Sequence, residues 1–280
     1  MPFSSEDSDG SRKGADSPAA WIATGLRSIE TYSLDVAAGV VGAAIFLQSF
    51  AETGAAPWTA FLCLGCAAVA VYNIDHLVDS RDLRQAVTPR KARHRGRRRS
   101  MAWLAGLAML AGAATVPWLP GRILLGGALL VAYMGAYFAG VLLGIGGVPK
   151  RLAAAIGWAA AAALPTFAAV EDPTSPRLLA AVAILAGAAW LNLQSYAIAD
   201  GPGEGRPADR PGPVLRVTTV LGVAMLLSAA LFLDPAHLVP WLALASTVVL
   251  QVVLPGLPAG LVHPLGEWGF ALLALVGLGR

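Results

Sequence analysis

Hydrophobic and polar positions fall into long blocks along this chain, and not into the short alternation of an exposed strand. Runs of roughly 20 mostly apolar residues, the length that a helix needs to cross a bilayer, are separated by short breaks rich in Pro, Gly and charged residues. These runs predict nine membrane-spanning helices, at about residues 29–51, 57–78, 101–119, 122–143, 152–170, 177–199, 214–233, 238–255 and 259–278. Because backbone groups in lipid must bond within the protein, runs of this length favour helices over a β-barrel.

Composition supports a membrane protein. Of the 280 residues, 56% are hydrophobic and only 13% are charged, about half the charged fraction of a soluble domain. The mean hydropathy is +0.64. We therefore predict an all-α polytopic membrane protein, a bundle of about nine transmembrane helices over residues 27–280. Residues 1–26 are rich in Ser, Asp and Gly and lack the apolar core of a signal peptide, so we expect a disordered tail there.

The distribution of Lys and Arg predicts the orientation in the membrane. Four basic clusters precede the first span or follow the second, fourth and sixth spans: Arg12, Lys13 and Arg27; Arg81 to Arg99; Lys150 and Arg151; Arg206, Arg210 and Arg216. With nine spans and a cytoplasmic N-terminus, all four clusters fall on the cytoplasmic side, as the positive-inside rule requires. We expect a multi-pass protein of a cell membrane, the inner membrane of a bacterium, with its N-terminus and acidic segments in the cytoplasm.

The most basic segment is Lys91–Arg99, with the sequence KARHRGRRR. In a soluble protein such a run would indicate nucleic-acid binding. Between two spanning helices it is expected instead to fix the topology and to lie on anionic lipid headgroups. The sequence therefore predicts no nucleic-acid partner.

The second span ends in the acidic stretch VYNIDHLVDSRDLR. Asp75 and Asp79 are four residues apart and share one helix face, where two carboxylates repel each other unless a cation lies between them. Mg²⁺ commonly takes one or two protein carboxylates together with substrate phosphates. Asp82 continues the same face, and Asn73 adds a nearby amide oxygen. The alternative is an acidic helix end that neighbouring arginines neutralise.

The sixth span ends in WLNLQSYAIADGPGEGRPADR, on the same predicted side of the membrane. Asn192 and Tyr196 place polar groups deep in an apolar helix, and such groups usually face the bundle interior. We predict that both bind substrate. Asp200 and Glu204 repeat the four-residue carboxylate spacing and are further candidate metal ligands. The alternative for Asp200 is an ordinary helix-end residue.

Other ionisable residues add candidates. Lys150 and Arg151 lie before the fifth span and suit an anionic phosphate ligand, although they equally suit the positive-inside rule. Asp35 lies inside the first span and is a functional candidate for that reason, with no partner evident. His263 and Glu267 are expected to flank the last span at its cytoplasmic end, His263 as a boundary residue.

This arrangement resembles the UbiA superfamily of intramembrane prenyltransferases, which has nine helices and two aspartate-rich motifs after the second and sixth helices. Asp75-His-Leu-Val-Asp79 is similar to the end of the first motif, and RQAVTPRKARHR is similar to the basic loop that follows. YAIADGPGEGRPADR resembles the second motif, with Asp200 and Glu204 at its last two acidic positions. The segment around Lys150 resembles the Lys/Arg entrance to the family's fifth helix.

The resemblance implies an enzyme that moves an isoprenyl group from an isoprenyl diphosphate to a lipophilic, aromatic acceptor. Mg²⁺ would be held by catalytic Asp75, Asp79 and Asp200, while Lys150 and Arg151 neutralise the diphosphate. The prenyl tail would lie in an apolar groove that is open to the membrane. Its expected lining, for which simple helix packing is the alternative, is Tyr133, Tyr137, Phe138 and Trp158.

The sequence also departs from the family pattern. Val71 and Tyr72 stand where Asn-Asp is usual, and Ala197 replaces an aspartate of the second motif. These departures favour an alternative, a non-catalytic relative that binds a prenyl lipid or a partner. A small transporter with Asp35 as its ion site is ranked last, because no inverted repeat is evident.

Overall fold

A computed structural model of the chain describes residues 28–50, 55–79, 89–145, 147–199, 237–257 and 259–278. The described residues are 90% helical and contain no strand. The predicted all-helical class is therefore confirmed for this part of the chain. The tail 1–26 and the predicted span 214–233 lie outside the described residues, so the total of nine spans stays a prediction.

Seven helical segments of the described residues are long and apolar enough to cross a membrane. They are α3 (Trp58–Asp79), α5 (Arg98–Thr115), α6 (Gly121–Leu142), α7 (Gly147–Ala169), α8 (Pro176–Ala199), α10 (Leu238–Val253) and the pair α11 (Ala259–Leu272) and α12 (Ala274–Leu278). A shorter apolar helix, α2 (Leu34–Leu47), precedes them, and the basic segment between α3 and α5 forms α4 (Pro89–Gly96). The predicted second and sixth spans agree with α3 and α8 to within a residue.

Three predicted spans differ from the structure, two in their limits and the last only in its continuity. The first span, predicted over 29–51, is shortened to α2 and a 3-10 turn at Gln48–Phe50. Ser33 takes a left-handed backbone conformation (φ 57°), which interrupts the helix directly before α2. The last span, predicted as one helix, is broken at Leu273 between α11 and α12. The fifth span begins at Gly147, earlier than predicted. Pro149 is accommodated in the first helical turn, because a proline there costs no hydrogen bond.

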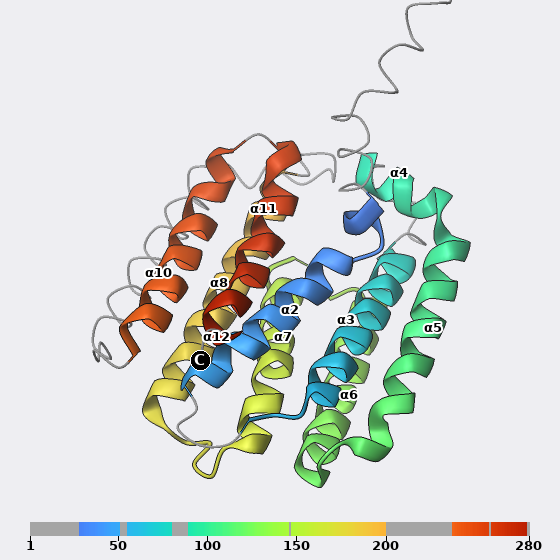
Figure 1. The fold of residues 1–280 in the computed structure, drawn as a ribbon. Coiled ribbons are helices and arrows are strands. Elements are labelled where there is room, and N and C mark those ends of the chain that lie inside the picture. Colours follow the sequence, from blue (N-terminus) through green and yellow to red (C-terminus); the bar gives the residue numbers. More distant parts are fainter. Residues whose placement is uncertain are drawn as a thin grey trace, which may run out of the picture.

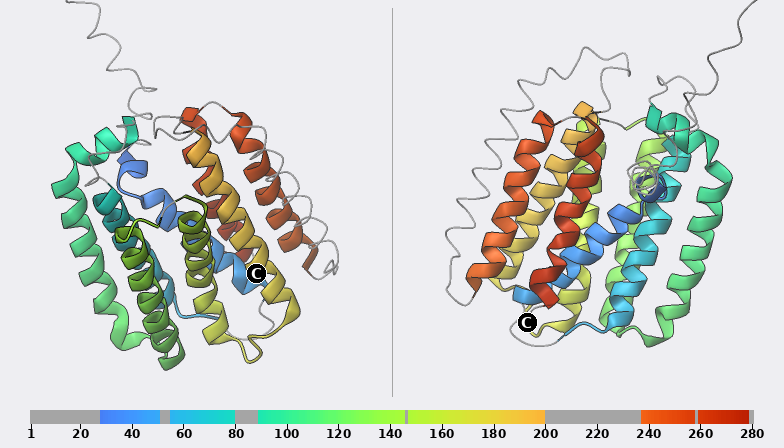
Figure 2. Two further views of the ribbon diagram at one scale, coloured as in Figure 1. Left: turned by 180° about the vertical axis from the view of Figure 1, so that it is seen from behind. Right: turned by 45° about the horizontal axis from the view of Figure 1, so that its top comes forward.

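The helix α2 runs obliquely through the middle of the bundle (Figure 1). It contacts α3, α7 and α11 and packs less extensively on α8. Viewed from behind, α6, α7 and α8 form the opposite face (Figure 2). Because α2 contacts helices on both sides, it links the half that contains α3 to the half that contains α11.

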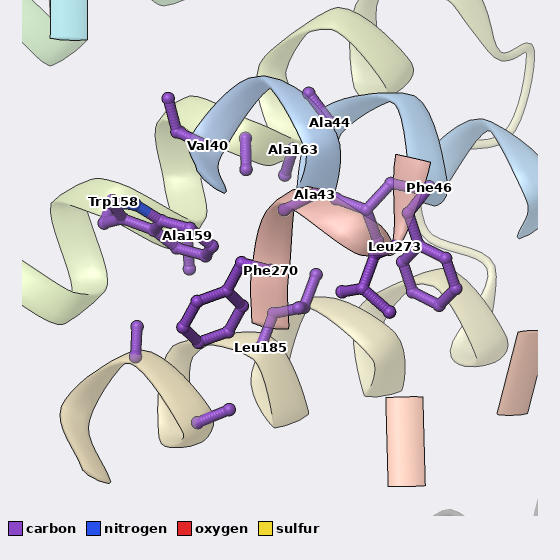
Figure 3. Packing of buried hydrophobic residues seen from close by; sticks show 14 of the residues in the cluster. Val40, Ala43, Ala44, Phe46, Trp158, Ala159, Ala163, Leu185, Phe270 and Leu273 are labelled. Atoms are coloured by element: carbon purple, nitrogen blue, oxygen red, sulfur yellow. The ribbon is translucent and has the colours of Figure 1, made fainter. Parts of the chain in front are cut away.

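The apolar core surrounds α2. Figure 3 shows side chains of α2, α7, α8 and α11 in one cluster, among them Val40, Ala43, Phe46, Ala159, Ala163, Leu185 and Phe270. The rings of Trp158 and Phe270 lie 4.8 Å apart between centroids. Trp158 therefore belongs to the core, and the alternative of simple packing holds for this predicted groove residue.

Helices α2 and α11 approach each other closely. A Cβ atom on Gly42 would lie 2.7 Å from Ala271 Cα and 2.8 Å from the carbonyl oxygens of Phe270 and Ala271. Helices in lipid associate through this kind of close approach at small residues, because apolarity alone does not drive them together. Gly42 thus sets the distance between α2 and α11.

The charged residues at the helix ends divide between the two ends of the bundle. The C-terminal ends of α3, α6 and α8 and the N-terminal ends of α5, α7 and α11 lie at one end of the bundle, near α4 (Figures 1 and 2). Asp79 and Lys150 are therefore at this end, while Arg122 and Arg177, at the starts of α6 and α8, are at the other. This agrees with the alternation predicted from the charges. Which end faces the cytoplasm stays a prediction.

Replacing Gly42 tests the contact between α2 and α11. We expect Gly42→Ala to lower the free energy of unfolding by about 1–3 kcal/mol, because its methyl group would overlap the α11 backbone. The matched control is Gly127→Ala in α6, where nothing lies within 4 Å of the new atom. There the higher helix propensity of Ala should raise stability by roughly 0.5–1 kcal/mol. Thermal unfolding in detergent measures both, and equal midpoints would contradict the close contact.

Candidate functional site

Asp75 and Asp79 occupy the last two turns of α3 and face Lys150 in the first turns of α7. Lys150 Nζ lies 2.9 Å from each carboxylate oxygen of Asp79 and 3.6 Å from Oδ1 of Asp75. The side chains of Asp75 and Asp79 are 17% and 36% exposed, and that of Lys150 is 21% exposed. The ion pairs of Lys150 are thus partly buried, and the Asp79 carboxylate remains accessible to solvent.

Tyr137 on α6 completes this group. Its hydroxyl donates to Asp75 Oδ1 at 3.2 Å, so three helices contribute side chains. We refer to Asp75, Asp79, Tyr137 and Lys150 as the acidic site. The predicted helix face shared by the two aspartates is present in this arrangement, and Lys150 of α7 lies against it.

The chemistry of the acidic site fits a hard divalent cation next to an anion. Two carboxylates four residues apart are the protein contribution that Mg²⁺ usually takes, with phosphate oxygens and water as its other ligands. Among the described residues, no group of three or more His, Cys, Asp and Glu side chains could hold a metal ion. The further predicted ligands, Asp82, Asp200 and Glu204, lie outside the described residues, so their metal roles stay predictions.

Asn73 does not join the acidic site. Its side chain is fully buried, and its Nδ2 donates to the carbonyl oxygens of Val69 at 2.7 Å and Tyr32 at 2.9 Å. Residues two apart on a helix point in different directions, so Asn73 braces α3 against the segment before α2. Arg151 follows Lys150 on α7 and is half-buried. The predicted roles of Asn73 and Arg151 in substrate binding stay predictions.

A second group of polar side chains joins α8 to α11. Asn192 Nδ2 donates to Glu267 Oε1 at 2.8 Å and to the Tyr196 hydroxyl at 3.1 Å. The Tyr196 oxygen lies 2.9 Å from Glu267 Oε1 and 3.1 Å from the carbonyl oxygen of His263. We refer to Asn192, Tyr196, Glu267 and the His263 carbonyl as the polar cluster. The prediction that Asn192 and Tyr196 face the bundle interior is confirmed.

The expected place of His263 and Glu267 was wrong. They lie inside α11 rather than at its boundary, and only 8% and 5% of their surfaces are exposed. The reason is that α2, α8 and α10 enclose α11 at this depth, and polar groups of α8 bond to Glu267. The signal in the sequence was a pair of ionisable residues one helical turn apart within an apolar run, LVHPLGEWGF.

Gly266 makes room for the polar cluster. A Cβ atom there would collide with Asn192 Oδ1 and would lie 2.9 Å from the Tyr196 hydroxyl. Gln251 of α10 donates to the Gly266 carbonyl at 3.2 Å. The short distance between α8 and α11 therefore depends on a glycine at this position.

The two groups lie near each other around α2 and α3. Tyr72 on α3 is within electrostatic range of both Glu267 and Asp75. Asp35 on α2 is 5% exposed and interacts electrostatically with Tyr196. Asp35 is thus placed beside the polar cluster, and its role as an ion site stays a prediction. Among the described residues, α2 and α7 each contact both α3 and α8.

The aromatic residues predicted for a prenyl groove separate in the structure. Tyr137 belongs to the acidic site, and the ring of Phe138 packs beside it at 5.2 Å. Tyr133 donates to the Ala153 carbonyl at 2.7 Å and ties α6 to α7. Of these four residues, Tyr137 bonds to a carboxylate of the acidic site, and Phe138 packs against the Tyr137 ring.

Removing the charge of Lys150 tests the acidic site as a structural ion pair. In Lys150→Met, Asp75 and Asp79 would repel each other without a cation. We expect a loss of about 1–2 kcal/mol in the free energy of unfolding, less than for a fully buried pair because both carboxylates are partly exposed. Thermal unfolding in metal-free detergent solution measures it. Adding Asp75→Asn and Asp79→Asn to Lys150→Met should restore most of the loss, and no restoration would argue against charge repulsion as its cause.

Comparisons of the chain with family models, with curated proteins and with solved structures find no match. One fold can support many activities, so the helical fold alone does not identify a function, and the chemistry of the side chains is the guide to it. The acidic site and the polar cluster, both at the same end of an apolar helix bundle, are the two groups from which it can be argued.

Proposed function

We propose that this protein is a prenyltransferase of the membrane interior. It would move an isoprenyl group from an isoprenyl diphosphate to a lipophilic, aromatic acceptor, as the resemblance to the UbiA superfamily implies. The observation that carries the proposal is the acidic site, in which Asp75 and Asp79 of α3 meet Lys150 of α7 at one end of the bundle. The charged side chains of such a site can bind an anionic headgroup, while the apolar helices beside it accommodate an apolar tail.

The residues of the acidic site have distinct roles in this proposal. Asp75 and Asp79 would hold Mg²⁺, which supplies Lewis-acid stabilisation of the leaving diphosphate when it is bound. Lys150 contributes a positive charge that is already fixed at the position of the phosphate oxygens, so little reorganisation is needed as negative charge develops. The Tyr137 hydroxyl holds Asp75 in position through their hydrogen bond.

The exposed apolar face of α6 supports a donor that enters from the membrane. On α6, Leu125, Leu129 and Val131 are 67%, 66% and 73% exposed, so this helix faces lipid along its length. An isoprenyl tail is as apolar as the lipid chains and can lie along such a face while its diphosphate reaches Lys150.

A second candidate is a non-catalytic protein that binds a prenyl lipid. It is favoured by the neutralisation of Asp75 and Asp79 by Lys150, and by the absence of a third carboxylate beside them among the described residues. Such a protein would bind an isoprenyl diphosphate without Mg²⁺ and would release no diphosphate. Diphosphate release by the purified protein separates the two candidates.

Replacement of the two aspartates tests the proposed function. In Asp75→Asn and Asp79→Asn, the ligands for Mg²⁺ are lost while the side-chain volume is kept. We expect each to abolish the Mg²⁺-dependent thermal stabilisation of the detergent-solubilised protein by a panel of isoprenyl diphosphates. Unchanged stabilisation in both variants would overturn the proposal.

The matched control is Asp172→Asn in the loop between α7 and α8, at the opposite end of the bundle (Figure 1). Hydrogen bonds from the hydroxyl and the backbone N–H of Thr174 hold the pKa of Asp172 below its usual value. Asp172 is therefore charged at neutral pH, and its replacement removes the same charge far from Lys150. This variant should respond to the donor and Mg²⁺ as the unmodified protein does.

A further inference from the structure

The outer face of α5 carries a row of exposed side chains that changes from charged to apolar along the helix. Arg99, Trp103 and Leu107 follow one another at intervals of four residues, and Leu110 comes three residues later. Residues at these spacings share one face of an α-helix. Trp103, Leu107 and Leu110 are 65%, 59% and 70% exposed, and Arg99 is exposed as well. We refer to these four residues as the outer stripe.

The packing of α5 leaves the outer stripe facing the membrane. Among the described spanning helices, α5 packs mainly against α3, and it lies at an edge of the bundle in every view (Figures 1 and 2). Met101, Ala105 and Ala108 form its buried side. At about 3.6 residues per turn, the outer stripe lies on the side of the helix opposite to them. Its apolar part is therefore in contact with lipid chains.

The charged end of the outer stripe belongs to three consecutive arginines. Arg97, Arg98 and Arg99 are all exposed where α4 meets α5. The first turn of α5 contains no acidic residue, and no carboxylate of the described residues pairs with Arg98 or Arg99. Positive charges at the start of a helix are also unfavourable to its dipole. The described part of the chain thus leaves these charges uncompensated, and an external anion would compensate them.

Two ring contacts hold this basic segment against the bundle. The ring of His94 in α4 is buried and stacks on the ring of His76 in α3, with 4.2 Å between the centroids. The guanidinium of Arg97 lies 5.7 Å from the centroid of the Tyr32 ring, within the range of a cation–π contact. The arginines are therefore presented from a packed segment at the end of the bundle that also contains the acidic site.

We propose that the outer stripe, together with Arg98, binds an anionic phospholipid of the membrane leaflet at this end of the bundle. Arg98 and Arg99 would contact the headgroup phosphate, because guanidinium groups form charge-assisted hydrogen bonds with phosphate oxygens. The indole of Trp103 would lie at the membrane–water interface, where tryptophan is enriched. The acyl chains would lie along Leu107 and Leu110. This site does not include the acidic site, so it does not depend on the proposed function.

The other end of the same span offers an internal comparison. Trp118 is 67% exposed there, and a single exposed arginine, Arg122, follows it four residues later. A tryptophan at each end agrees with two interface positions. The three consecutive arginines stand only beside Trp103, so the preference for an anionic lipid belongs to that end.

Competition between two lipids tests the site in the full-length protein in detergent. Native mass spectrometry at low salt measures the binding of phosphatidylglycerol and of phosphatidylcholine with the same acyl chains. We expect tighter binding of phosphatidylglycerol, and the preference should fall about fivefold for each arginine replaced in Arg98→Gln and Arg99→Gln. Arg98→Lys and Arg99→Lys keep the charge and should keep most of the preference. Equal binding of both lipids by the unmodified protein would overturn the proposal.

Arg122→Gln is the matched control, because it removes one exposed arginine at the opposite end. It should leave the preference unchanged. A loss as large as that in Arg99→Gln would trace the preference to net charge and contradict a site on α5. The same contradiction follows if Arg98→Gln and Arg99→Gln together keep the full preference.

The apolar part of the site has its own test. Trp103→Ala should weaken the binding of both lipids by a similar factor, since the contact it removes does not depend on the headgroup. An excess of glycerol 3-phosphate, which carries the phosphate without chains, should not displace phosphatidylglycerol. Complete displacement would identify a site for free phosphate esters and overturn the assignment to a lipid.

Discussion

A polar side chain inside an apolar helix bundle needs a hydrogen-bond partner within the protein, because neither lipid nor apolar neighbours can offer one. This constraint orders the charged and polar end of the molecule. Lys150 of α7 bonds to Asp79 of α3, and Asn192 of α8 bonds to Glu267 of α11. Each of these contacts joins helices that are far apart in the sequence, so the groups that can do chemistry also hold the bundle together.

Such contacts require that the helices approach closely, and small residues on α2 and α11 allow it. Gly42 lets α2 touch the α11 backbone, and Gly266 lets Asn192 reach Glu267. The oblique course of α2 between the two halves of the bundle (Figure 1) places Asp35 beside the polar cluster. The position of the polar cluster is therefore a consequence of backbone packing.

The sequence predicted those features that depend on local pattern. The limits of α3 and α8 follow from apolar runs that end in acidic residues, and the shared face of Asp75 and Asp79 follows from helical periodicity. The break at Ser33 and the one at Leu273 have no such signal, since neither is a glycine or a proline. The burial of Glu267 also escaped prediction, because it depends on which helices enclose α11. The contact between Lys150 and Asp79 was not predicted either, because it depends on how α7 packs against α3.

The separation of the two groups has a chemical rationale within the proposed function. Departure of a diphosphate requires a fixed positive charge. Lys150 provides this charge, which is already paired with the carboxylates of Asp75 and Asp79. The carboxylate of Glu267 accepts hydrogen bonds from Asn192 and Tyr196 on another pair of helices, so one end of the bundle carries two distinct polar groups.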